Sequence, residues 1–207
     1  MRLYLVRHGE TEWNRWDKLQ GQVNIPLNEN GERQAEKLAK VLAGQQFDTI
    51  YSSPLSRCVS TAEIVCGKDA NIELNPIIVE MAFGIYEGFN FGDMTIDESH
   101  DLFTYFYDRI NYEPPAGAES IEDVVERAKI FLNEMLAKHQ NEKVIAFTHG
   151  AFLRCAIAFS RGLSIAEEKL IRPIHNCSVT VMKNVDDKIV LEQEAVDVIH
   201  GEKLKLI

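Results

Sequence analysis

The chain has 207 residues, of which 45% are hydrophobic and 26% are charged, as is typical of a globular protein with a sizeable core. Its formal net charge of −10 argues against nucleic acid or an anionic membrane as a partner. No apolar run approaches the roughly 20 residues that span a bilayer, and the N-terminal apolar stretch is too short for a secretory signal, so the sequence predicts a cytoplasmic protein.

The N-terminal half alternates between strand-like and helix-like segments. Residues 2–6 form a short, continuous apolar run, which is typical of a strand buried on both faces of a parallel sheet. Residues 29–43 carry an apolar stripe at helical spacing, and residues 47–53 form a second candidate strand. Ser53 followed by Pro54 predicts a capped helix that begins directly after this strand.

The C-terminal half continues this alternation. Ser120 and Asp123 resemble a capping box ahead of an amphipathic helix. Residues 143–147 form another buried strand pattern, and residues 151–162 are apolar almost all round, as expected of a helix in a layered core. Alternating polar and apolar residues about a turn at 186–187 predict a hairpin at the sheet edge.

These patterns predict one α/β domain over residues 1–207, built as a three-layer αβα sandwich with a mostly parallel central sheet. We expect residues 90–119 to form an inserted helical lid. In such sheets, ligands bind beyond the carboxyl ends of the strands. His8, Ser53 and His149 each follow a predicted strand, so the three residues should converge at one rim.

Cationic and imidazole groups gather at this rim. Arg7 directly precedes His8, and Arg57 lies in the first turn of the helix after the second strand. His149 and Gly150 stand before a helix whose free N–H groups point at the same space. Two arginines, two histidines and a helix N-terminus together predict a site for a dianion, above all a phosphoryl group.

The motif LVRHGETEWN resembles the signature of the histidine phosphatase (phosphoglycerate mutase-like) superfamily. Further segments resemble other parts of that family, in family order and along nearly the whole chain. They are QGQVNIPLNENGERQA, YSSPLSRCVSTAEIV, VEMAFGIYEG, THGAFLR and NCSVTVM.

The resemblance implies that His8 is the nucleophile and becomes a phosphohistidine, while Glu80 protonates the leaving group. Glu87 is the rival candidate for this acid. Because the acid must act as a base in the second step, we expect a mildly acidic pH optimum. The oxygens of the transferred group would be neutralised by Arg7, Arg57 and His149. The residues expected to line the pocket are Asn14, Gln20, Gly21 and Gly150.

A metal centre is the competing explanation for clustered histidines. His8, His149 and Glu80 could form one, but Arg7 and Arg57 beside them would repel a divalent cation. The histidines also lack metal-binding spacing. We therefore expect no metal, no cofactor and full activity in the presence of a chelator.

The family that the motifs resemble contains both phosphatases and mutases. A phosphoglycerate mutase must hold a carboxylate and a second phosphate, whereas residues 90–119 offer Arg109 as their one full positive charge among seven acidic residues. We predict a phosphomonoester hydrolase acting on a small phosphorylated metabolite, with a cofactor-dependent phosphoglycerate mutase as the alternative. A non-catalytic phosphoprotein-binding module is less favoured because the expected nucleophile and acid are present. The natural substrate and the choice between monomer and homodimer stay open.

Aromatic residues in the same segment allow two interpretations. They could face the substrate, forming a tolerant lid for monophosphates with an apolar or neutral remainder, or they could be the core-facing stripe of one helix. The residues concerned are Phe91, Phe103, Tyr105, Phe106, Tyr107 and Tyr112.

Overall fold

A central β-sheet organises the fold, which the computed structural model describes for residues 1–92, 98, 100 and 102–206. In this part of the chain the sheet has six strands in the order β3-β2-β4-β1-β5-β6. The first four in that order are parallel to one another, whereas β5 and β6 are antiparallel to their neighbours on the β1 side. The strands are β1 (Arg2–Arg7), β2 (Thr49–Ser52), β3 (Ile72–Leu74), β4 (Lys143–Thr148), β5 (Val179–Val185) and β6 (Lys188–Val196). The predicted mostly parallel sheet is confirmed.

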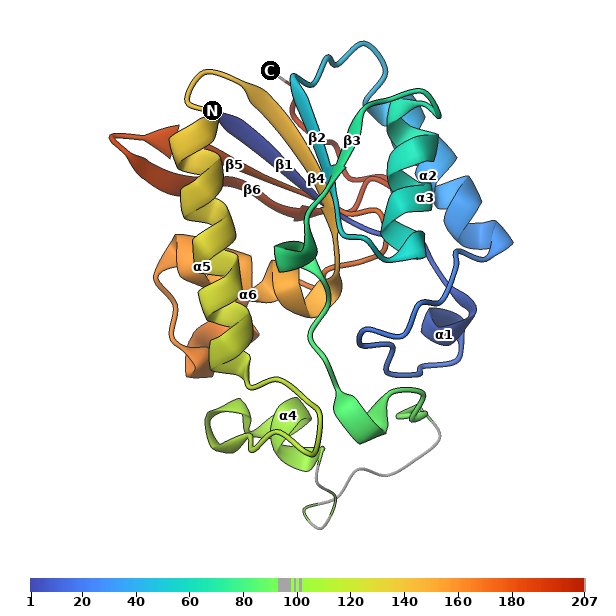
Figure 1. Ribbon diagram of the computed structural model, residues 1–207, viewed down its shortest axis with the longest axis vertical. Coiled ribbons are helices and arrows are strands. Elements are labelled where there is room, and N and C mark those ends of the chain that lie inside the picture. The colour runs from blue at the N-terminus through green and yellow to red at the C-terminus, as the bar shows by residue number, and fades with distance from the viewer. Residues whose placement is uncertain (93–97, 99, 101, 207) are drawn as a thin grey trace.

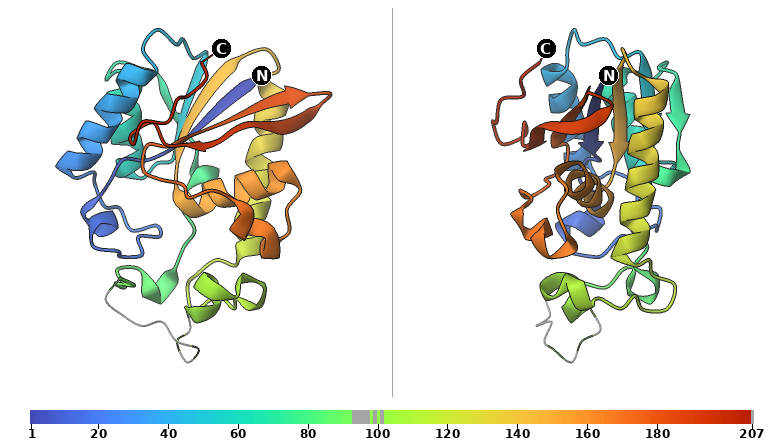
Figure 2. Two further views of the ribbon diagram at one scale, coloured as in Figure 1. Left: turned by 180° about the vertical axis from the view of Figure 1, so that it is seen from behind. Right: turned by 90° about the vertical axis from the view of Figure 1, so that its left-hand side faces the viewer.

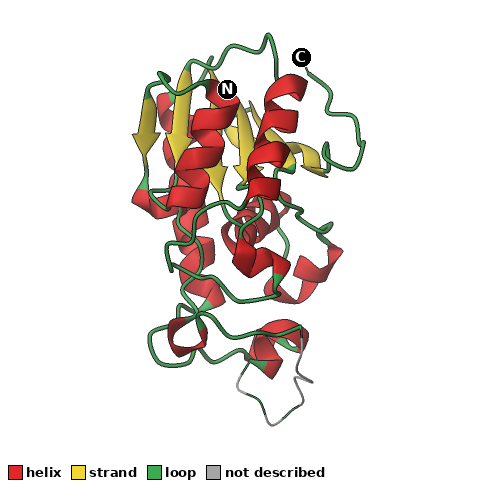
Figure 3. Ribbon diagram, turned by 90° about the vertical axis from the view of Figure 1, so that its right-hand side faces the viewer, coloured by secondary structure: helices red, strands yellow, loops and turns green. Residues whose placement is uncertain are grey.

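Helices cover both faces of this sheet (Figures 1 and 2). Alternate residues of β1 show why: Leu3 and Leu5 belong to one buried cluster, and Tyr4 and Val6 belong to the other. The first cluster includes residues of α5 (Ile121–Lys138) and α6 (Gly150–Arg161), and the second includes residues of α2 (Glu29–Val41) and α3 (Ser56–Cys66). Figure 3 shows the strands enclosed between helices. The predicted three-layer αβα sandwich is confirmed.

Of the two helix starts for which the sequence predicted a cap, α5 follows the prediction and α3 does not. The predicted capping box at the start of α5 is present, because Ser120 and Asp123 each bind the other's backbone N–H. The helix predicted to begin at Pro54 instead begins at Ser56, after Leu55, whose backbone is still extended (ψ 134°). Ser53 is therefore not the cap; its hydroxyl lies 2.8 Å from His149 Nε2 at the rim of the sheet.

The hairpin of β5 and β6 is confirmed. Its turn residues Asp186 and Asp187 both have left-handed backbones, with φ of 49° and 56°, as a tight two-residue hairpin turn requires. β3 was not predicted, because it is a three-residue edge strand with two exposed side chains and no apolar run. The shorter helices are α1 (Glu12–Arg15), α4 (Phe103–Tyr107) and the 3₁₀ turns η1 (Pro76–Ile78), η2 (Gly84–Tyr86), η3 (Arg109–Asn111) and η4 (Ile165–Leu170). No described helix is both long and apolar enough to cross a membrane.

The aromatic residues of 90–119 divide between the two interpretations. Tyr105 and Tyr112 are buried, and Phe106 packs against the same core cluster. Phe91 lines the cavity described below, and Tyr107 is 68% exposed. The segment contains α4 and η3, and its function as a lid stays a prediction, as does the assignment of 1–207 to a single domain. Three of its acidic residues lie outside the described residues: Asp93, Asp97 and Asp101.

Candidate active site

The carboxyl ends of β1 and β4 bring two histidines together. The strands are parallel and in register, so that Arg7 pairs with Thr148 and the N–H of His8 donates to the Thr148 carbonyl at 3.0 Å. His149 is the next residue of the chain, and its ring centroid lies 5.2 Å from that of His8. Sheet register alone therefore places these two side chains, which stand 141 positions apart in the sequence, side by side.

His8 is held as a neutral imidazole with one free nitrogen. Its Nδ1 lies 2.7 Å from the Gly9 carbonyl oxygen. Because a carbonyl can only accept, Nδ1 carries the proton and Nε2 keeps its lone pair. Burial, followed by the charges of Arg57 and Arg7, lowers the His8 pKa well below its ordinary value of 6.5. Near neutral pH the ring is thus uncharged, and the lone pair of Nε2 is present without prior deprotonation.

Arg57 is fully buried and is oriented by three groups. Its Nη1 and Nη2 donate to the carbonyls of Val23 and Gly21, both at 2.8 Å. Its Nε donates to His149 Nδ1 at 3.2 Å, and His149 Nε2 in turn lies 2.8 Å from the hydroxyl of Ser53. Burial and the adjacent guanidinium of Arg57 lower the pKa of His149 well below 6.5. His149 is therefore a neutral group packed behind Arg57, with both ring nitrogens engaged.

Arg7 contributes a second guanidinium with an unused donor. Its Nη1 donates to the Ile174 carbonyl at 2.6 Å, while the buried Nε has no hydrogen-bond partner within the described part of the chain. A donor without a partner is costly inside a protein, so it is suited to an incoming anion. Gly150 lies alongside: a side-chain carbon placed there would be 3.6 Å from Arg7 Nε and 3.8 Å from Glu80 Oε2.

Glu80 lines the same cavity as Arg7 and His8. Its Oε1 accepts hydrogen bonds from the backbone N–H groups of Met81, Ala151 and Phe152 at 3.0, 3.1 and 3.2 Å. Two of these donors are in the first turn of α6. The carboxyl group is therefore fixed in orientation, with Arg7 and His8 among its neighbours in the cavity wall.

Glu87, the rival candidate for the acid, does not line the cavity. Its Oε1 accepts from the N–H groups of Gln22 and Phe83 at 2.9 and 3.2 Å, so it joins two loops. Gly21 has a left-handed backbone (φ 51°), and a side-chain carbon there would lie 2.0 Å from Glu87 Oε1. Glu87 thus supports the loop whose Gly21 carbonyl orients Arg57.

These groups surround a cavity of about 330 Å³. Seven of the predicted residues line it: Arg7, His8, Asn14, Gln20, Gly21, Arg57 and Glu80. His149 and Gly150 were also predicted at the site, but they do not line the cavity. Four further lining residues were not predicted: Trp13, Asp17, Lys18 and Asn176. Phe91 also lines the cavity, as one of the two interpretations of the aromatic residues in 90–119 allowed.

Two of the missed residues had a sequence signal. Trp13 belongs to the motif that contains His8, and Asn176 opens the NCSVTVM segment; Asn176 Nδ2 donates to the His8 carbonyl at 3.0 Å. Asp17 and Lys18 had none, because they reach the cavity through pairing with a distant segment. The N–H of Phe91 donates to the Asp17 carbonyl at 2.9 Å, and Lys18 pairs with Asn90.

Among the residues that the structure describes, no group of three histidine, cysteine, aspartate or glutamate side chains has an arrangement that could hold a metal ion. The cavity is lined by a neutral imidazole, two guanidinium groups and a carboxyl group. A tetrahedral oxyanion is the ligand class that these groups fit together.

Comparison with known proteins identifies the family of the chain. Residues 3–196 match the family model described as histidine phosphatase superfamily (branch 1). A metal-independent phosphoserine phosphatase from Arabidopsis thaliana is 32% identical over 194 residues, covering 92% of this chain and 79% of that protein. A probable phosphoglycerate mutase, GpmB, from Cronobacter sakazakii is 34% identical over 187 residues, covering 87% and 83%.

A solved structure agrees in fold. A phosphoserine phosphatase mutant from Entamoeba histolytica, in complex with phosphoserine, has a TM-score of 0.81 at 28% identity and covers 94% of this chain and 96% of its own. The family expected from the motifs is confirmed, and so is the expected class of activity, hydrolysis of small phosphate monoesters.

Proposed function

Because this chain belongs to the histidine phosphatase superfamily, we propose that it hydrolyses phosphate monoesters through a phosphohistidine formed on Nε2 of His8. One observation carries the proposal. His8 has a neutral ring with its Nδ1–H bound to the Gly9 carbonyl, and it lines the same cavity as Arg7, Arg57 and Glu80. An imidazole in this state can attack phosphorus, and guanidinium groups stabilise the charge that spreads over the transferred oxygens.

The reaction has two steps. In the first, the His8 Nε2 lone pair forms a bond to phosphorus, the ester P–O bond breaks, and Glu80 gives a proton to the departing oxygen. In the second, Glu80 takes a proton from water as the water oxygen attacks phosphorus, the N–P bond breaks, and inorganic phosphate leaves. Arg7 and Arg57 hold the phosphoryl oxygens throughout, and His149 and Ser53 keep Arg57 in place.

Hydrolysis is favoured over mutase activity by the state of Arg109. This residue, the one arginine or lysine of 90–119, forms an ion pair with Glu168 at 3.0 Å, and Glu168 is only 1% exposed. The guanidinium also stacks on Tyr105, 4.8 Å from the ring centroid. Its charge is thus neutralised within the protein, and it is not available to bind a second acidic group of a bisphosphate.

The charged residues that line the cavity favour a substrate that carries one positive and one negative group in addition to its phosphate. Asp17 and Lys18 both line the cavity, as do the aromatic residues Trp13 and Phe91. A carboxylate and an ammonium group together match the ammonium and carboxylate of an amino-acid ester. Phosphoserine, with which the Entamoeba protein was crystallised, is therefore the first substrate to test. We propose a metal-independent, cytoplasmic enzyme.

The test is release of phosphate from phosphoserine, phenyl phosphate and 3-phosphoglycerate, with and without a chelator. We expect hydrolysis of phosphoserine that the chelator leaves unchanged and that His8→Ala abolishes. Conversion of 3-phosphoglycerate to its isomer faster than its hydrolysis would favour the mutase, and absence of turnover on every ester would favour a binding module. Activity that requires added zinc or magnesium would contradict the proposal.

A further inference from the structure

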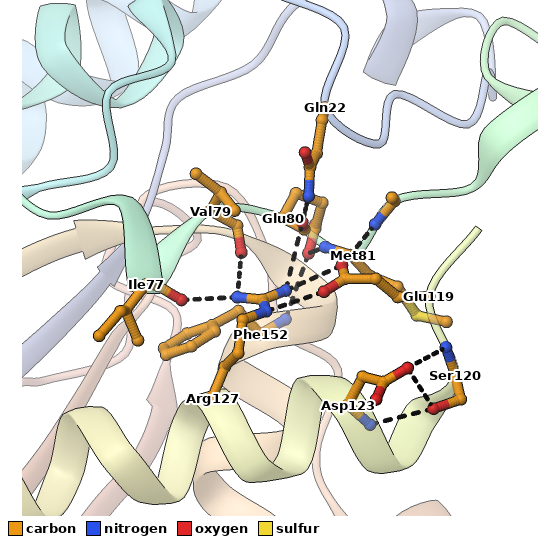
Figure 4. A network of polar contacts seen from close by, with 11 residues as sticks. Gln22, Ile77, Val79, Glu80, Met81, Glu119, Ser120, Asp123, Arg127 and Phe152 are labelled. Carbon is orange, nitrogen blue, oxygen red and sulfur yellow. Dashed lines mark hydrogen bonds and ion pairs between the residues drawn. The ribbon is translucent and has the colours of Figure 1, made fainter. Parts of the chain in front are cut away.

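A network of polar contacts joins α5 to the segment that carries Glu80 (Figure 4). Arg127, on α5, reaches across to this segment and binds its backbone rather than its side chains. Arg127 Nη1 donates to the carbonyls of Ile77 and Val79 at 2.5 and 3.1 Å, and Nη2 donates to the Glu80 carbonyl at 3.5 Å. One guanidinium therefore fixes the main chain at Glu80 and at the residue before it.

Glu119 fixes the same segment on its other side. It forms a two-pronged ion pair with Arg127, with Nε–Oε1 and Nη2–Oε2 distances both 2.9 Å. Its Oε2 also accepts from the N–H of Ala82 at 2.8 Å, and its own N–H donates to the Ala82 carbonyl at 3.0 Å. The chain from residue 77 to residue 82 is thus held on both sides of Glu80.

Arg127 contacts the elements that hold both the main chain and the carboxyl group of Glu80. The carboxyl group binds the N–H of Phe152 at the start of α6, and the Arg127 guanidinium lies 5.7 Å from the centroid of the Phe152 ring. Arg127 itself is not among the residues that line the cavity, so it does not touch a bound phosphate.

We infer that Arg127, oriented by Glu119, is a positioning residue that sets the place of the Glu80 carboxyl group relative to the leaving-group oxygen. The inference rests on the proposed function, in which Glu80 is the general acid. Lysine cannot replace arginine here, because a single ammonium group cannot reach three carbonyls and two carboxylate oxygens in one plane. A displaced acid slows the transfer of a proton to poor leaving groups but matters little for leaving groups that depart without one.

The test compares kcat/KM for phosphoserine, whose leaving group is a basic alkoxide, with kcat/KM for 2,4-dinitrophenyl phosphate, whose leaving group needs no proton. For Arg127→Lys we expect a loss on the order of 10- to 100-fold with phosphoserine and less than about 3-fold with the dinitrophenyl ester, since general acid catalysis is worth about 10²–10⁴-fold. Glu119→Gln should give the same pattern with a smaller loss. Glu119→Gln also tests the positioning role if the Arg127→Lys variant does not fold.

Arg2→Lys is the matched control. Arg2 also forms a two-pronged pair with a glutamate, Glu192, at similar burial, but on the sheet and away from the cavity. It should leave both rates unchanged. Equal losses on both esters in Arg127→Lys, with an unequal loss in Glu80→Gln, would overturn the positioning role alone. Equal losses in Glu80→Gln would overturn the acid role of Glu80, and the inference with it.

Discussion

At the scale of single residues, the site depends on keeping an imidazole uncharged beside two arginines. Burial disfavours the imidazolium of His8, and Arg57 and Arg7 disfavour it further. The same guanidinium groups are then available to a dianion. That His8, Arg7, Arg57 and Glu80 line one cavity could be predicted from the sequence, because each follows a strand or stands in a recognisable motif. The tautomer of His8 could not, because it depends on the position of the Gly9 carbonyl.

The first prediction concerns the protonation of His8. The ring can attack phosphorus when it is neutral but not when it is protonated. As the pH is lowered, kcat/KM should therefore begin to fall well below pH 6.5, where His8 takes up a proton. Arg57→Gln removes a neighbouring positive charge, which should raise the His8 pKa toward 6.5. An NMR titration of the His8 ring measures this independently of activity. Arg33→Gln, on the exposed face of α2, is the control that should leave the titration unchanged. A parent His8 that titrates at or above 6.5 would refute the explanation.

At the scale of elements, loops between strands and helices determine which charges enter the cavity. The loop at Gly21 supplies the carbonyl that orients Arg57, and Glu87 supports this loop from the segment after η2. The sequence indicated that Gly21 belongs near the site. It did not show that Glu87 supports the loop instead of serving as the acid, because that distinction depends on which of two nearby carboxyl groups points inward.

The second prediction tests this loop. In Gly21→Ala the added methyl group would lie 2.0 Å from Glu87 Oε1 on a backbone with positive φ, so either the Glu87 side chain leaves its contacts or the loop shifts. Both changes weaken the support of the Gly21 carbonyl that orients Arg57. We expect a loss of activity on the order of 100-fold and destabilisation of about 1–3 kcal/mol, measured by turnover and by urea unfolding. Gly44→Ala is the matched control. Gly44 also has positive φ but has open space around it, so this variant should lose stability without losing activity.

At the scale of the whole molecule, a protein of net charge −10 builds a cationic pocket at one rim of its sheet. Continuous apolar runs predicted β1 and β4, and the parallel register of these strands then brings together His8 and His149. The alternation of elements was enough to predict three layers. It could not predict β3, because a three-residue edge strand has no apolar periodicity. Nor could it predict the late start of α3, because nothing in the sequence shows that the Ser53 hydroxyl contacts His149 instead of capping the helix. Nor could it show that Arg109 is neutralised by Glu168, since that pair joins two short 3₁₀ turns, η3 and η4, that lie far apart in the sequence.

The most direct test of the account is to find where the phosphoryl group resides during turnover. Protein mixed with phosphoserine, quenched in alkali and digested without acid should yield a peptide phosphorylated on His8, with a bond that is stable in base and labile in acid. When 2,4-dinitrophenyl phosphate, whose leaving group needs no proton, is the donor, Glu80→Gln should retain more of this label than the parent, because water must then attack phosphorus without a base. Phosphate release with no label on His8, or an equal label in His8→Ala, would contradict the account.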